Sequence, residues 1–451
     1  MMRMQAVIGA GYGDEGKGRT VDALVAAAQH DGLSPWVVRF NSGAQAGHTV
    51  VTPDGRRHVF HQVGSGALLG APTYLGPEVV LNPWLLDGEL DALAACGVND
   101  PRLIADPSAP VSVPCDAMIN QALEHARGAG RHGSCGVGFG ETVERSEDPA
   151  FALRVIDLTD DSRIRAKLAA IRHEYLPRRL EAVGLPPDAL DAWIDNTALI
   201  DRFVADALSL GARLEWRAPH VLADQEALIF EGAQGLRLDQ DIGDFPFVTR
   251  SHTGLPGIAR LARDAGLCGR CPLDVHYVTR AYRTRHGAGP LPDEIPVAPA
   301  PGFSDPTNVP NPYQGNLRFA LLDPDALRSD IERDLDRVSR KPQRQMGEQP
   351  FDGDPLNGEI LVVHPLLEVT CLDQMGPRTL WRNGACWPTA DLALATAETT
   401  GIPLIAEAWG PARTDRTESA VNAEHKRVIP TIGKRCDETV RESCYAVMAL
   451  P

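Results

Sequence analysis

Residues 6–20 read Ala6-Val7-Ile8-Gly9-Ala10-Gly11-Tyr12-Gly13-Asp14-Glu15-Gly16-Lys17-Gly18-Arg19-Thr20. A short apolar run leads into a glycine-rich turn, and the turn leads into residues 21–28, whose composition is typical of a helix. This order predicts a strand, a phosphate-binding loop and a helix. Glycines leave backbone N–H groups open to an anion, and the positive end of the helix faces the same anion.

Two charged residues of this loop indicate phosphate chemistry. Lys17 supplies a point charge suited to phosphate. Asp14 places a carboxylate where a plain phosphate cradle has no use for one, which indicates a metal ion, a proton transfer or both. The spacing is shorter than in the common Gly-x-x-x-x-Gly-Lys-Ser/Thr loop, and a purely connecting turn is the alternative interpretation.

Strand and helix patterns alternate along the rest of the chain. Alternation of this kind predicts an α/β fold with a mainly parallel sheet and ligand loops at the strand C-terminal ends. Residues 50–52 and 59–63 flank Pro53-Asp54-Gly55 and predict a hairpin. Further strands are predicted at 36–40, 79–81, 228–230, 275–278, 360–364 and 366–370, and helices at about 84–96, 116–128 and 162–212.

Composition limits the class of protein. The chain has 451 residues, 43% of them apolar, which suffices for one large α/β domain with insertions or for two joined domains. A net charge of −16 gives no general reason to bind nucleic acid or an anionic membrane. The sequence has no apolar run of about eighteen residues and no secretory signal, so we expect a cytoplasmic protein. Its nine cysteines, including the Cys268-Gly-Arg-Cys271 pair, are expected to be reduced and structural rather than a zinc or redox site.

The loop Gly13-Asp14-Glu15-Gly16-Lys17-Gly18, followed by Ala46-Gly47-His48-Thr49, resembles the adenylosuccinate synthetases. That family joins aspartate to the 6-position of inosine monophosphate at the expense of GTP. The resemblance continues through Glu231-Gly232-Ala233-Gln234-Gly235, Thr284-Arg285-His286-Gly287-Ala288-Gly289-Pro290, Leu372-Asp373 and Gly410-Pro411.

The resemblance implies one domain over residues 1–451, with a central, mostly parallel sheet and helices on both faces. Its expected additions are a helical insertion at about 116–212, a mobile loop at about 291–313 and a polar insertion at about 341–358. It also implies a homodimer in which an arginine of one subunit reaches the site of the other, and Arg154 is the candidate for that arginine.

Replacing a ring C=O by C–N requires that the oxygen first become a phosphate ester, because oxide is a poor leaving group. Asp14 is the predicted base that takes the ring N–H proton, and His48 is the predicted acid that stabilises the phosphoryl oxygens. By resemblance, Asp14 and the carbonyl of Gly47 also hold Mg²⁺. The residues predicted to bind the nucleotide phosphates are Gly13, Glu15, Gly16, Lys17, Gly18 and Thr49.

The acceptor pocket departs from the family pattern. Gln45 stands for an asparagine, Cys135 for a phosphate-contacting threonine, and His286 for a valine. Thr249 matches a phosphate-binding threonine, although a strand-end threonine that caps a turn is equally compatible with the spacing. The residues predicted to bind the acceptor nucleotide are Gln45, Ser134, Cys135, Gln234, Thr249 and His286.

The amine-donor loop departs further. The family's Thr-Thr-Gly-Arg-x-Arg-Arg corresponds to residues 313–319, and Arg318 is the one arginine kept. We predict that Gly315, Asn316 and Arg318 bind the amine donor, although a dicarboxylate such as aspartate favours more cations.

The pocket for the triphosphate base keeps Asp373 as an acceptor for guanine, while Cys371 replaces a lysine. Trp409, before Gly410 and Pro411, offers a ring that can stack on a base. GTP is therefore the predicted co-substrate, with ATP as the alternative.

Together these features predict a magnesium-dependent purine nucleotide ligase. Its substrates would be a purine monophosphate, a nucleoside triphosphate and an amino acid, either aspartate or a replacement. A nucleotide-dependent kinase or phosphatase and a nucleotide-binding sensor are the alternatives. The pairing of Asp14 with His48 favours catalysis, because binding alone needs neither residue.

Overall fold

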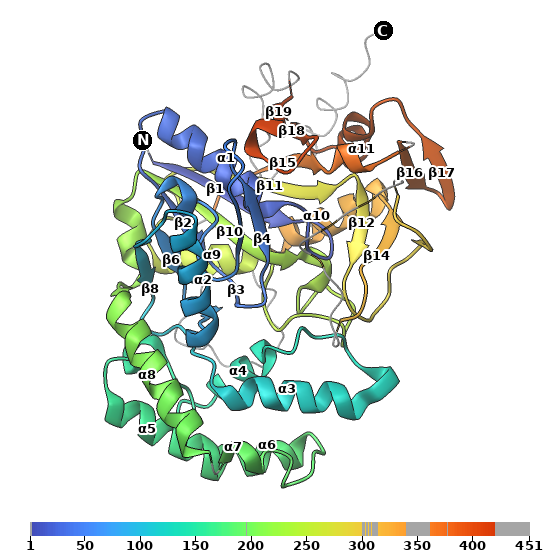
Figure 1. Cartoon of the computed structure of the whole chain (residues 1–451). Coiled ribbons are helices and arrows are strands. Elements are labelled where there is room, and N and C mark those ends of the chain that lie inside the picture. The colour runs from blue at the N-terminus through green and yellow to red at the C-terminus, as the bar shows by residue number, and fades with distance from the viewer. Residues whose placement is uncertain are drawn as a thin grey trace, which may run out of the picture.

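The computed structural model describes residues 2–194, 196–299, 303, 305, 308, 314–339, 361–376 and 378–419. A large sheet in the order β19-β18-β15-β11-β1-β10-β2-β6-β8-β9 forms its centre (Figure 1). Its strands are β1 Arg3–Gly9, β2 Pro35–Arg39, β6 Thr73–Leu75, β8 Leu103–Ala105, β9 Glu215–Trp216, β10 Ala227–Gly235, β11 Leu273–Arg280, β15 Val363–Thr370, β18 Leu404–Ala408 and β19 Arg416–Glu418. Neighbouring strands pair in parallel, except β18 with β19. The predicted mainly parallel sheet is confirmed.

Strand β1 lies between β10 and β11 and is buried on both faces. Ala6 and Ile8 pack into the core on one face, and Val7 packs on the opposite face. A strand covered on both faces reads as a continuous apolar run, which explains the sequence pattern before the glycine loop.

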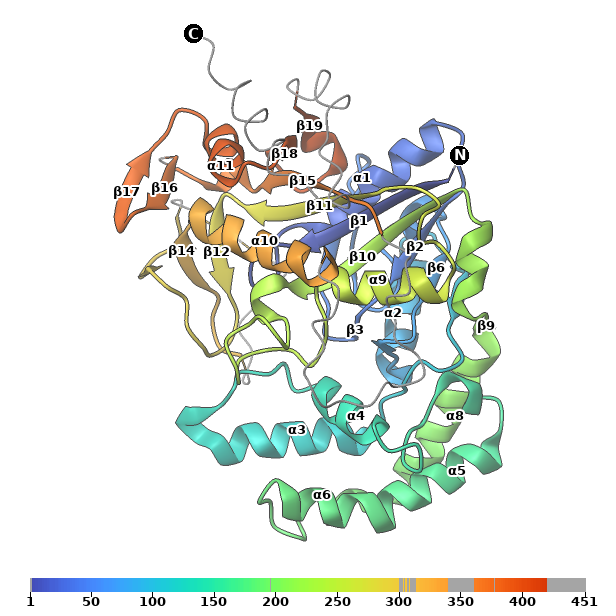
Figure 2. The same cartoon turned by 180° about the vertical axis from the view of Figure 1, so that it is seen from behind.

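Helices cover both faces of this sheet, as predicted. Helix α1 (Lys17–His30) packs through Val21 and Val25 on the face that carries Val7. Helices α9 (Leu255–Asp264) and α10 (Pro324–Ser339) lie on the opposite face, and the view from behind brings them forward (Figure 2).

Short sheets border the central one. The predicted hairpin is confirmed as antiparallel β4 and β5, whereas the strand predicted at 79–81 pairs outside the central sheet, as β7 with β3. The bounds of these strands are β3 Ser42–Gly43, β4 His48–Val51, β5 Arg57–Phe60, β7 Val79–Val80, β12 Tyr282–Arg285, β13 Glu294–Ile295, β14 Arg318–Leu321, β16 Thr379–Arg382 and β17 Ala385–Pro388.

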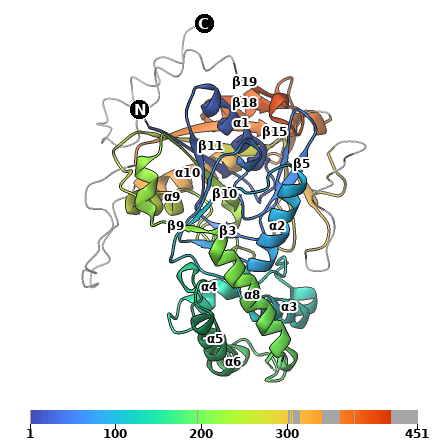
Figure 3. The same cartoon turned by 60° about the vertical axis from the view of Figure 1, so that its left-hand side comes forward.

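The region predicted as a helical insertion forms a layer to one side of the sheet (Figure 3). The remaining helices are α2 Pro83–Ala95, α3 Pro114–Arg127, α4 Phe139–Ser146, α5 Asp161–Ala170, α6 Leu176–Ala182, α7 Asp191–Ile194, α8 Thr197–Arg213 and α11 Leu392–Thr400, of which α11 packs in the same core as α9 and α10. A separate hydrophobic core joins Ile164, Phe203 and Leu210 of this layer to Leu75 and Leu103 at the sheet edge. Residues 183–190 interrupt the helix predicted over 162–212, because Pro186 and Pro187 cannot continue it.

Other predictions need adjustment. Helix α4 begins at Phe139, four residues after Cys135, whereas the sequence predicted no separate helix start within the region 116–212. Strand β13 pairs with β14 inside the loop predicted at 291–313, while most of 300–313 and all of 341–358 lie outside the described residues. In the described part of the chain, no helix is long and apolar enough to cross a membrane.

Candidate functional site

The glycine loop after β1 is organised around the buried carboxylate of Glu15. Its Oε1 accepts hydrogen bonds from the backbone N–H groups of Gly11 (3.1 Å) and Gly13 (2.8 Å), and its Oε2 pairs with Lys17 Nζ at 2.6 Å. A Cβ atom on Gly9 would overlap that carboxylate, so the glycine is required by close approach. Glu15 is therefore a structural centre of the loop that also fixes Lys17.

Asp14 occupies the middle of the loop in the left-handed region, with φ 64°. Its backbone carbonyl accepts a hydrogen bond from Arg280, a residue at the end of β11. Burial raises the pKa of the Asp14 carboxyl, while the charges of Arg280 and His286 oppose that rise. Gln234 (φ 66°) and Cys371 (φ 55°) share this backbone conformation, and strain of this kind clusters at functional sites.

His48 begins strand β4 and is held by Glu231 of β10. His48 Nδ1 lies 2.6 Å from Glu231 Oε1, and Glu231 also accepts hydrogen bonds from the backbone N–H (2.9 Å) and hydroxyl of Ser65. Burial lowers the pKa of His48 to about 4, although the charge of Glu231 opposes the shift. Burial alone would raise the pKa of Glu231, but Arg39 and His48 lower it to about 2. At neutral pH the pair is thus a neutral imidazole that donates Nδ1–H to a carboxylate.

The start of helix α1 packs directly on the His48 segment. A Cβ atom on Gly18 would lie 2.9 Å from His48 Cβ and 3.0 Å from its carbonyl carbon. This glycine lets the helix N-terminus and the histidine approach each other.

Two cavities meet at these residues. The larger one, of about 640 Å³, extends from the glycine loop toward α3 and α4, and the smaller one, of about 380 Å³, extends toward the end of β15. Both are lined by Asp14, Lys17, Gly47, His48, Arg57 and Asn308. The predicted base, acid and lysine therefore lie at the junction of two ligand-sized spaces.

The larger cavity collects the predicted acceptor residues. Gln45, Ser134, Cys135, Gln234, Thr249 and His286 line it. The amide nitrogen and oxygen of Gln45 are both buried and have no hydrogen-bond partner among the described residues. Sequence reasoning missed Asn120 of α3, whose Oδ1 accepts the Ser134 hydroxyl at 2.9 Å, because α3 gave only a helical pattern.

The smaller cavity collects most of the predicted triphosphate residues. Glu15, Gly16, Lys17, Gly18, Thr49, Asp373, Gly410 and Pro411 line it, whereas Gly13 lines the larger cavity. Trp409 lines neither, and its indole lies under the guanidinium of Arg378, 4.9 Å from the ring centroid. Arg280 and Gln374 also line the smaller cavity and were not predicted, because only the fold brings them there.

The predicted amine-donor residues Gly315, Asn316 and Arg318 line neither cavity. Arg318 pairs with Glu294 through Nε (3.0 Å) and its second terminal nitrogen (2.5 Å). Its other terminal nitrogen donates to the carbonyls of Gly287 (3.2 Å) and Gly289 (2.8 Å). Arg318 thus holds the loop that carries His286.

Arg154, the candidate for a dimer arginine, also lies outside both cavities, and its guanidinium donates to the Ser108 carbonyl at 2.6 Å.

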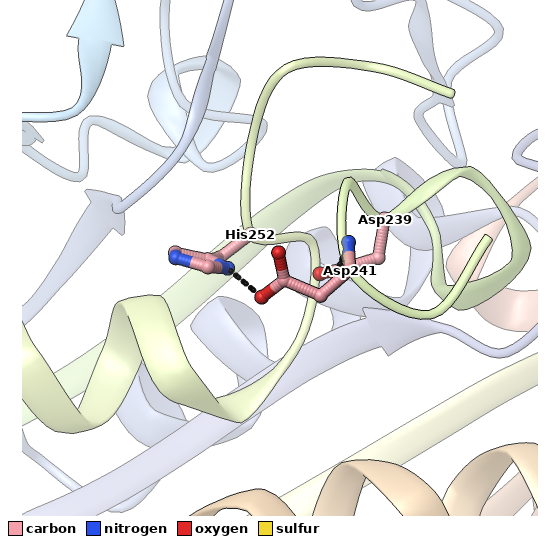
Figure 4. A group of neighbouring side chains, drawn as sticks. All are labelled: Asp239, Asp241 and His252. Atoms are coloured by element: carbon pink, nitrogen blue, oxygen red, sulfur yellow. Dashed lines mark hydrogen bonds and ion pairs between the residues drawn. The ribbon is translucent and has the colours of Figure 1, made fainter. Parts of the chain in front are cut away.

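One group of side chains has the composition of a metal site, and it lies outside the two cavities. Asp239, Asp241 and His252 bring their ligand atoms within 4.8 Å of one another (Figure 4). Arg337 already pairs with Asp239 at 3.2 Å and with Asp241 at 2.7 Å. A guanidinium therefore supplies the positive charge there, and the cluster has no need of a metal ion.

Comparison with known proteins identifies the family of the chain. The family model for adenylosuccinate synthetase matches residues 6–302. The adenylosuccinate synthetase of Anaeromyxobacter sp. (strain K) is 37% identical over 305 residues, which cover 64% of this chain and 64% of the relative. The adenylosuccinate synthetase of Alkalilimnicola ehrlichii is 36% identical over 308 residues, which cover 65% of this chain and 66% of the relative. The match spans just under two thirds of the length of these relatives.

Solved structures share the fold over nearly the whole chain. The fully ligated adenylosuccinate synthetase of Plasmodium falciparum has a TM-score of 0.67 at 18% identity, covering 92% of this chain and 100% of that one. The succinoaminodeoxyadenylate synthetase of cyanophage S-2L has a TM-score of 0.54 at 16% identity. This match covers 95% of our chain and 98% of the cyanophage chain. Because the family model matches well over half of the residues, the chain belongs to the adenylosuccinate synthetase family.

Proposed function

We propose that the protein is a purine nucleotide ligase of the adenylosuccinate synthetase type. It would phosphorylate the 6-oxo group of a purine monophosphate with a nucleoside triphosphate and then form a C–N bond to an amino acid. The observation that carries this proposal is the meeting of two cavities at Asp14, Lys17, Gly47 and His48. One cavity holds the acceptor, the other holds the triphosphate, and the transferred group passes between them.

In the first step the carboxylate of Asp14 takes the proton of the ring N1–H, which makes the 6-oxygen nucleophilic. That oxygen attacks the γ-phosphorus, the bond from phosphorus to the bridging oxygen breaks, and the nucleoside diphosphate leaves. The raised pKa of Asp14 suits it to this task, because burial makes the carboxylate a stronger base than an exposed aspartate.

His48 would stabilise the phosphoryl oxygens during this transfer. Its Nδ1–H is committed to Glu231, which leaves Nε2 for the ligand. Negative charge that arrives with the phosphates favours the protonated imidazole, so a proton can be held at Nε2 when both nucleotides are present. Glu231 fixes the ring orientation and stabilises that cation.

In the second step the amine attacks C6, its proton is lost, and phosphate leaves with the former 6-oxygen. Gln314 lines the larger cavity next to the predicted donor loop. The amine donor would thus enter from the side of residues 314–318.

The residues at the junction fit a magnesium ion. The Asp14 carboxylate and the Gly47 carbonyl are oxygen donors, the type Mg²⁺ takes together with substrate phosphates, and both residues line both cavities. When bound there, the ion would neutralise the charge of the phosphates. We propose GTP as the triphosphate because Asp373 can accept from the guanine N–H groups, with ATP as the alternative.

An altered substrate set is part of the proposal. Gln45, Cys135 and His286 replace residues that the resemblance expects, and all three line the acceptor cavity. The cyanophage relative was solved with dGMP and with dATP as the energy donor, so this fold accommodates nucleotides other than inosine monophosphate and GTP. The predicted cytoplasmic homodimer belongs to the same proposal and is checked by light scattering and cell fractionation.

The test is a substrate matrix. The full chain is incubated with Mg²⁺, with GTP or ATP, and with each combination of a purine monophosphate and an amino acid from a panel. Mass spectrometry then measures the masses of the nucleotides that are formed. We expect one adduct of nucleotide and amino acid, with one equivalent of phosphate released. Phosphate release that needs no amine would instead indicate a kinase or phosphatase, and nucleotide binding with no turnover would indicate a sensor.

A further inference from the structure

The backbone of the glycine loop is held at two consecutive carbonyls by side chains from neighbouring strands. Arg280, the last residue of β11, donates from Nε to the carbonyl of Asp14. Thr370, the last residue of β15, donates from its hydroxyl to the carbonyl of Glu15 at 2.8 Å. Asp14 has a left-handed φ of 64°, and a residue keeps such a conformation only where its surroundings fix it. Arg280 is therefore part of what holds the proposed base in place.

The guanidinium of Arg280 is itself fixed by a buried hydroxyl. Its Nη1 donates to Tyr282 Oη at 3.0 Å, and its Nη2 pairs with Asp305 at 3.2 Å. Tyr282 is 1% exposed, and its ring packs against Phe303 and Phe319. A tyrosine ring packed in this way has little freedom to turn, so its hydroxyl fixes the plane of the guanidinium that holds the loop.

The same hydroxyl is connected to the smaller cavity through Gln374. Because the Tyr282 hydroxyl accepts from Arg280, its own proton goes to another acceptor, and Gln374 Oε1 lies 2.5 Å away. This bond assigns the orientation of the amide. The Nε2 of Gln374 makes no hydrogen bond among the described residues and is not fully buried, and Gln374 lines the smaller cavity. The amide therefore accepts from the hydroxyl on one side and offers an N–H to the cavity on the other.

The partners of the Tyr282 hydroxyl indicate that it does more than satisfy the core. Tyr282 lines neither cavity, yet both Arg280 and Gln374 line the smaller one. Gln374 ends the short 3-10 helix Leu372–Gln374, which follows β15 and lies 92 positions along the chain from Tyr282. One end of this hydrogen-bond series is the Asp14 carbonyl, and the other end is the wall of the triphosphate cavity.

We propose that Tyr282 is a positioning residue for phosphoryl transfer. Through Arg280 it holds the backbone of Asp14, and through Gln374 it ties this hold to the triphosphate cavity. The inference rests on the proposed function, because it takes Asp14 as the base. Each hydrogen bond of the series constrains the next, so the loss of one loosens the base, and misplacing a catalytic group by about 1 Å costs about 10²-fold in rate.

The test starts with Tyr282→Phe, which removes the hydroxyl and keeps the ring. We expect kcat, measured as phosphate release with the substrates that the matrix identifies, to fall about fivefold, the equivalent of one lost hydrogen bond. KM for the acceptor nucleotide and for the amine should stay within about twofold, because Tyr282 lines neither cavity. This split between kcat and KM separates a positioning role from a loss of binding.

The matched control is Tyr74→Phe. Tyr74 is 0% exposed, its hydroxyl donates to the carbonyl of Arg217 at 3.2 Å, and both residues line neither cavity. Each change removes one buried hydroxyl, so both variants should lose similar amounts of thermal stability. We expect kcat to fall only in Tyr282→Phe, and equal kcat in the two variants would overturn the inference.

A double-mutant cycle tests the connection to the cavity. Gln374→Leu removes the acceptor of the Tyr282 hydroxyl and should also lower kcat about fivefold. Because both changes break the same series, the double variant should lose about fivefold, whereas independent changes would multiply to about 25-fold. Gln374→Glu keeps an oxygen acceptor for the hydroxyl, so its kcat should exceed that of Gln374→Leu.

Multiplying losses in the double variant would overturn the inference and leave the proposed function intact. Equal kcat in Gln374→Glu and Gln374→Leu would do the same, and this comparison decides if Tyr282→Phe does not fold. A wild-type chain with no turnover for any substrate combination would overturn the proposed function, and the inference with it.

Discussion

At the scale of single residues, Asp14 combines an unusual backbone with a reactive side chain. Asparagine tolerates its left-handed conformation, so Asp14→Asn removes the base while keeping the turn. His48→Asn likewise removes the predicted acid.

We predict that each of these two changes lowers kcat by about 10²-fold or more with the thermal unfolding midpoint near the wild-type value. Steady-state kinetics and thermal melts check the pair. Full activity in either variant would refute the role assigned to that residue.

The sequence motifs predicted that Asp14, Lys17 and His48 share one site, and the structure places all three where the two cavities meet. The roles assigned to them stay predictions. The partner of His48 was not predictable. Glu231 lies 183 positions away, and only the parallel pairing of β10 with β2 brings it beneath the imidazole. For Arg318 the sequence context predicts that the side chain binds the amine donor. In the structure its guanidinium instead donates to Glu294 and to two backbone carbonyls.

At the scale of elements, the approach of α1 to β4 fixes the distance between the phosphate loop and His48. Gly18→Ala would push α1 away from His48, because the new Cβ atom would lie only 2.9 Å from His48 Cβ. A displacement near 1 Å in a catalytic constellation costs about 10²-fold in rate.

We therefore predict that Gly18→Ala lowers kcat by about 10²-fold. Gly88→Ala is the control, since nothing lies within 4 Å of a Cβ in the middle of α2, and it should stabilise the chain by about 0.5–1 kcal/mol. Equal activity of the two variants, measured at one temperature, would contradict the packing argument.

The loop between β12 and β13 gives a second prediction at this scale. Arg318→Gln removes the guanidinium that holds the carbonyls of Gly287 and Gly289, so the His286 loop loosens. We expect KM for the acceptor nucleotide to rise about fivefold, the equivalent of one lost hydrogen bond, while KM for the amine stays constant. A rise confined to the amine would support the role predicted from the sequence instead.

At the scale of the whole molecule, the sheet and its two helical layers were predictable, because an alternating pattern with apolar strands specifies a mainly parallel architecture. The break between α6 and α7 and the start of α4 at Phe139 were not, since tertiary packing sets such boundaries. The match to the family model ends at residue 302, and the amine-donor and base-pocket residues lie beyond it. The predicted residues that line neither cavity, Gly315, Asn316, Arg318 and Trp409, all lie beyond that boundary.

Buried histidines make the fold sensitive to acid. Burial lowers the pKa of His48, His58 and His276 to about 4, whereas the unfolded chain titrates near 6.5. Between these values the unfolded state binds protons at these histidines that the folded state does not, so their contribution lowers the free energy of unfolding as pH falls from about 6.5 to 4. Burial raises the pKa of Glu89 and of Asp334 to about 7, so these two carboxyls contribute in the opposite direction over the same range.

His58→Leu should reduce the slope of the free energy of unfolding against pH by the equivalent of about one proton. The reason is that His58 is buried and its Nε2 has no partner among the described residues. Urea unfolding of the wild-type chain and the variant at a series of pH values measures this slope. An unchanged slope in the variant would show that His58 does not contribute.

The central claim is that the terminal phosphoryl group moves to the acceptor oxygen at the junction formed by Asp14 and His48. The most direct measurement uses GTP labelled with ¹⁸O at the bridge between the β- and γ-phosphates, with Mg²⁺, a purine monophosphate and no amine. Reversible transfer predicts that the label scrambles into the non-bridging β positions only when the purine monophosphate is present, and not with Asp14→Asn. Scrambling that is the same without the acceptor, or that fails with every purine monophosphate, would contradict it.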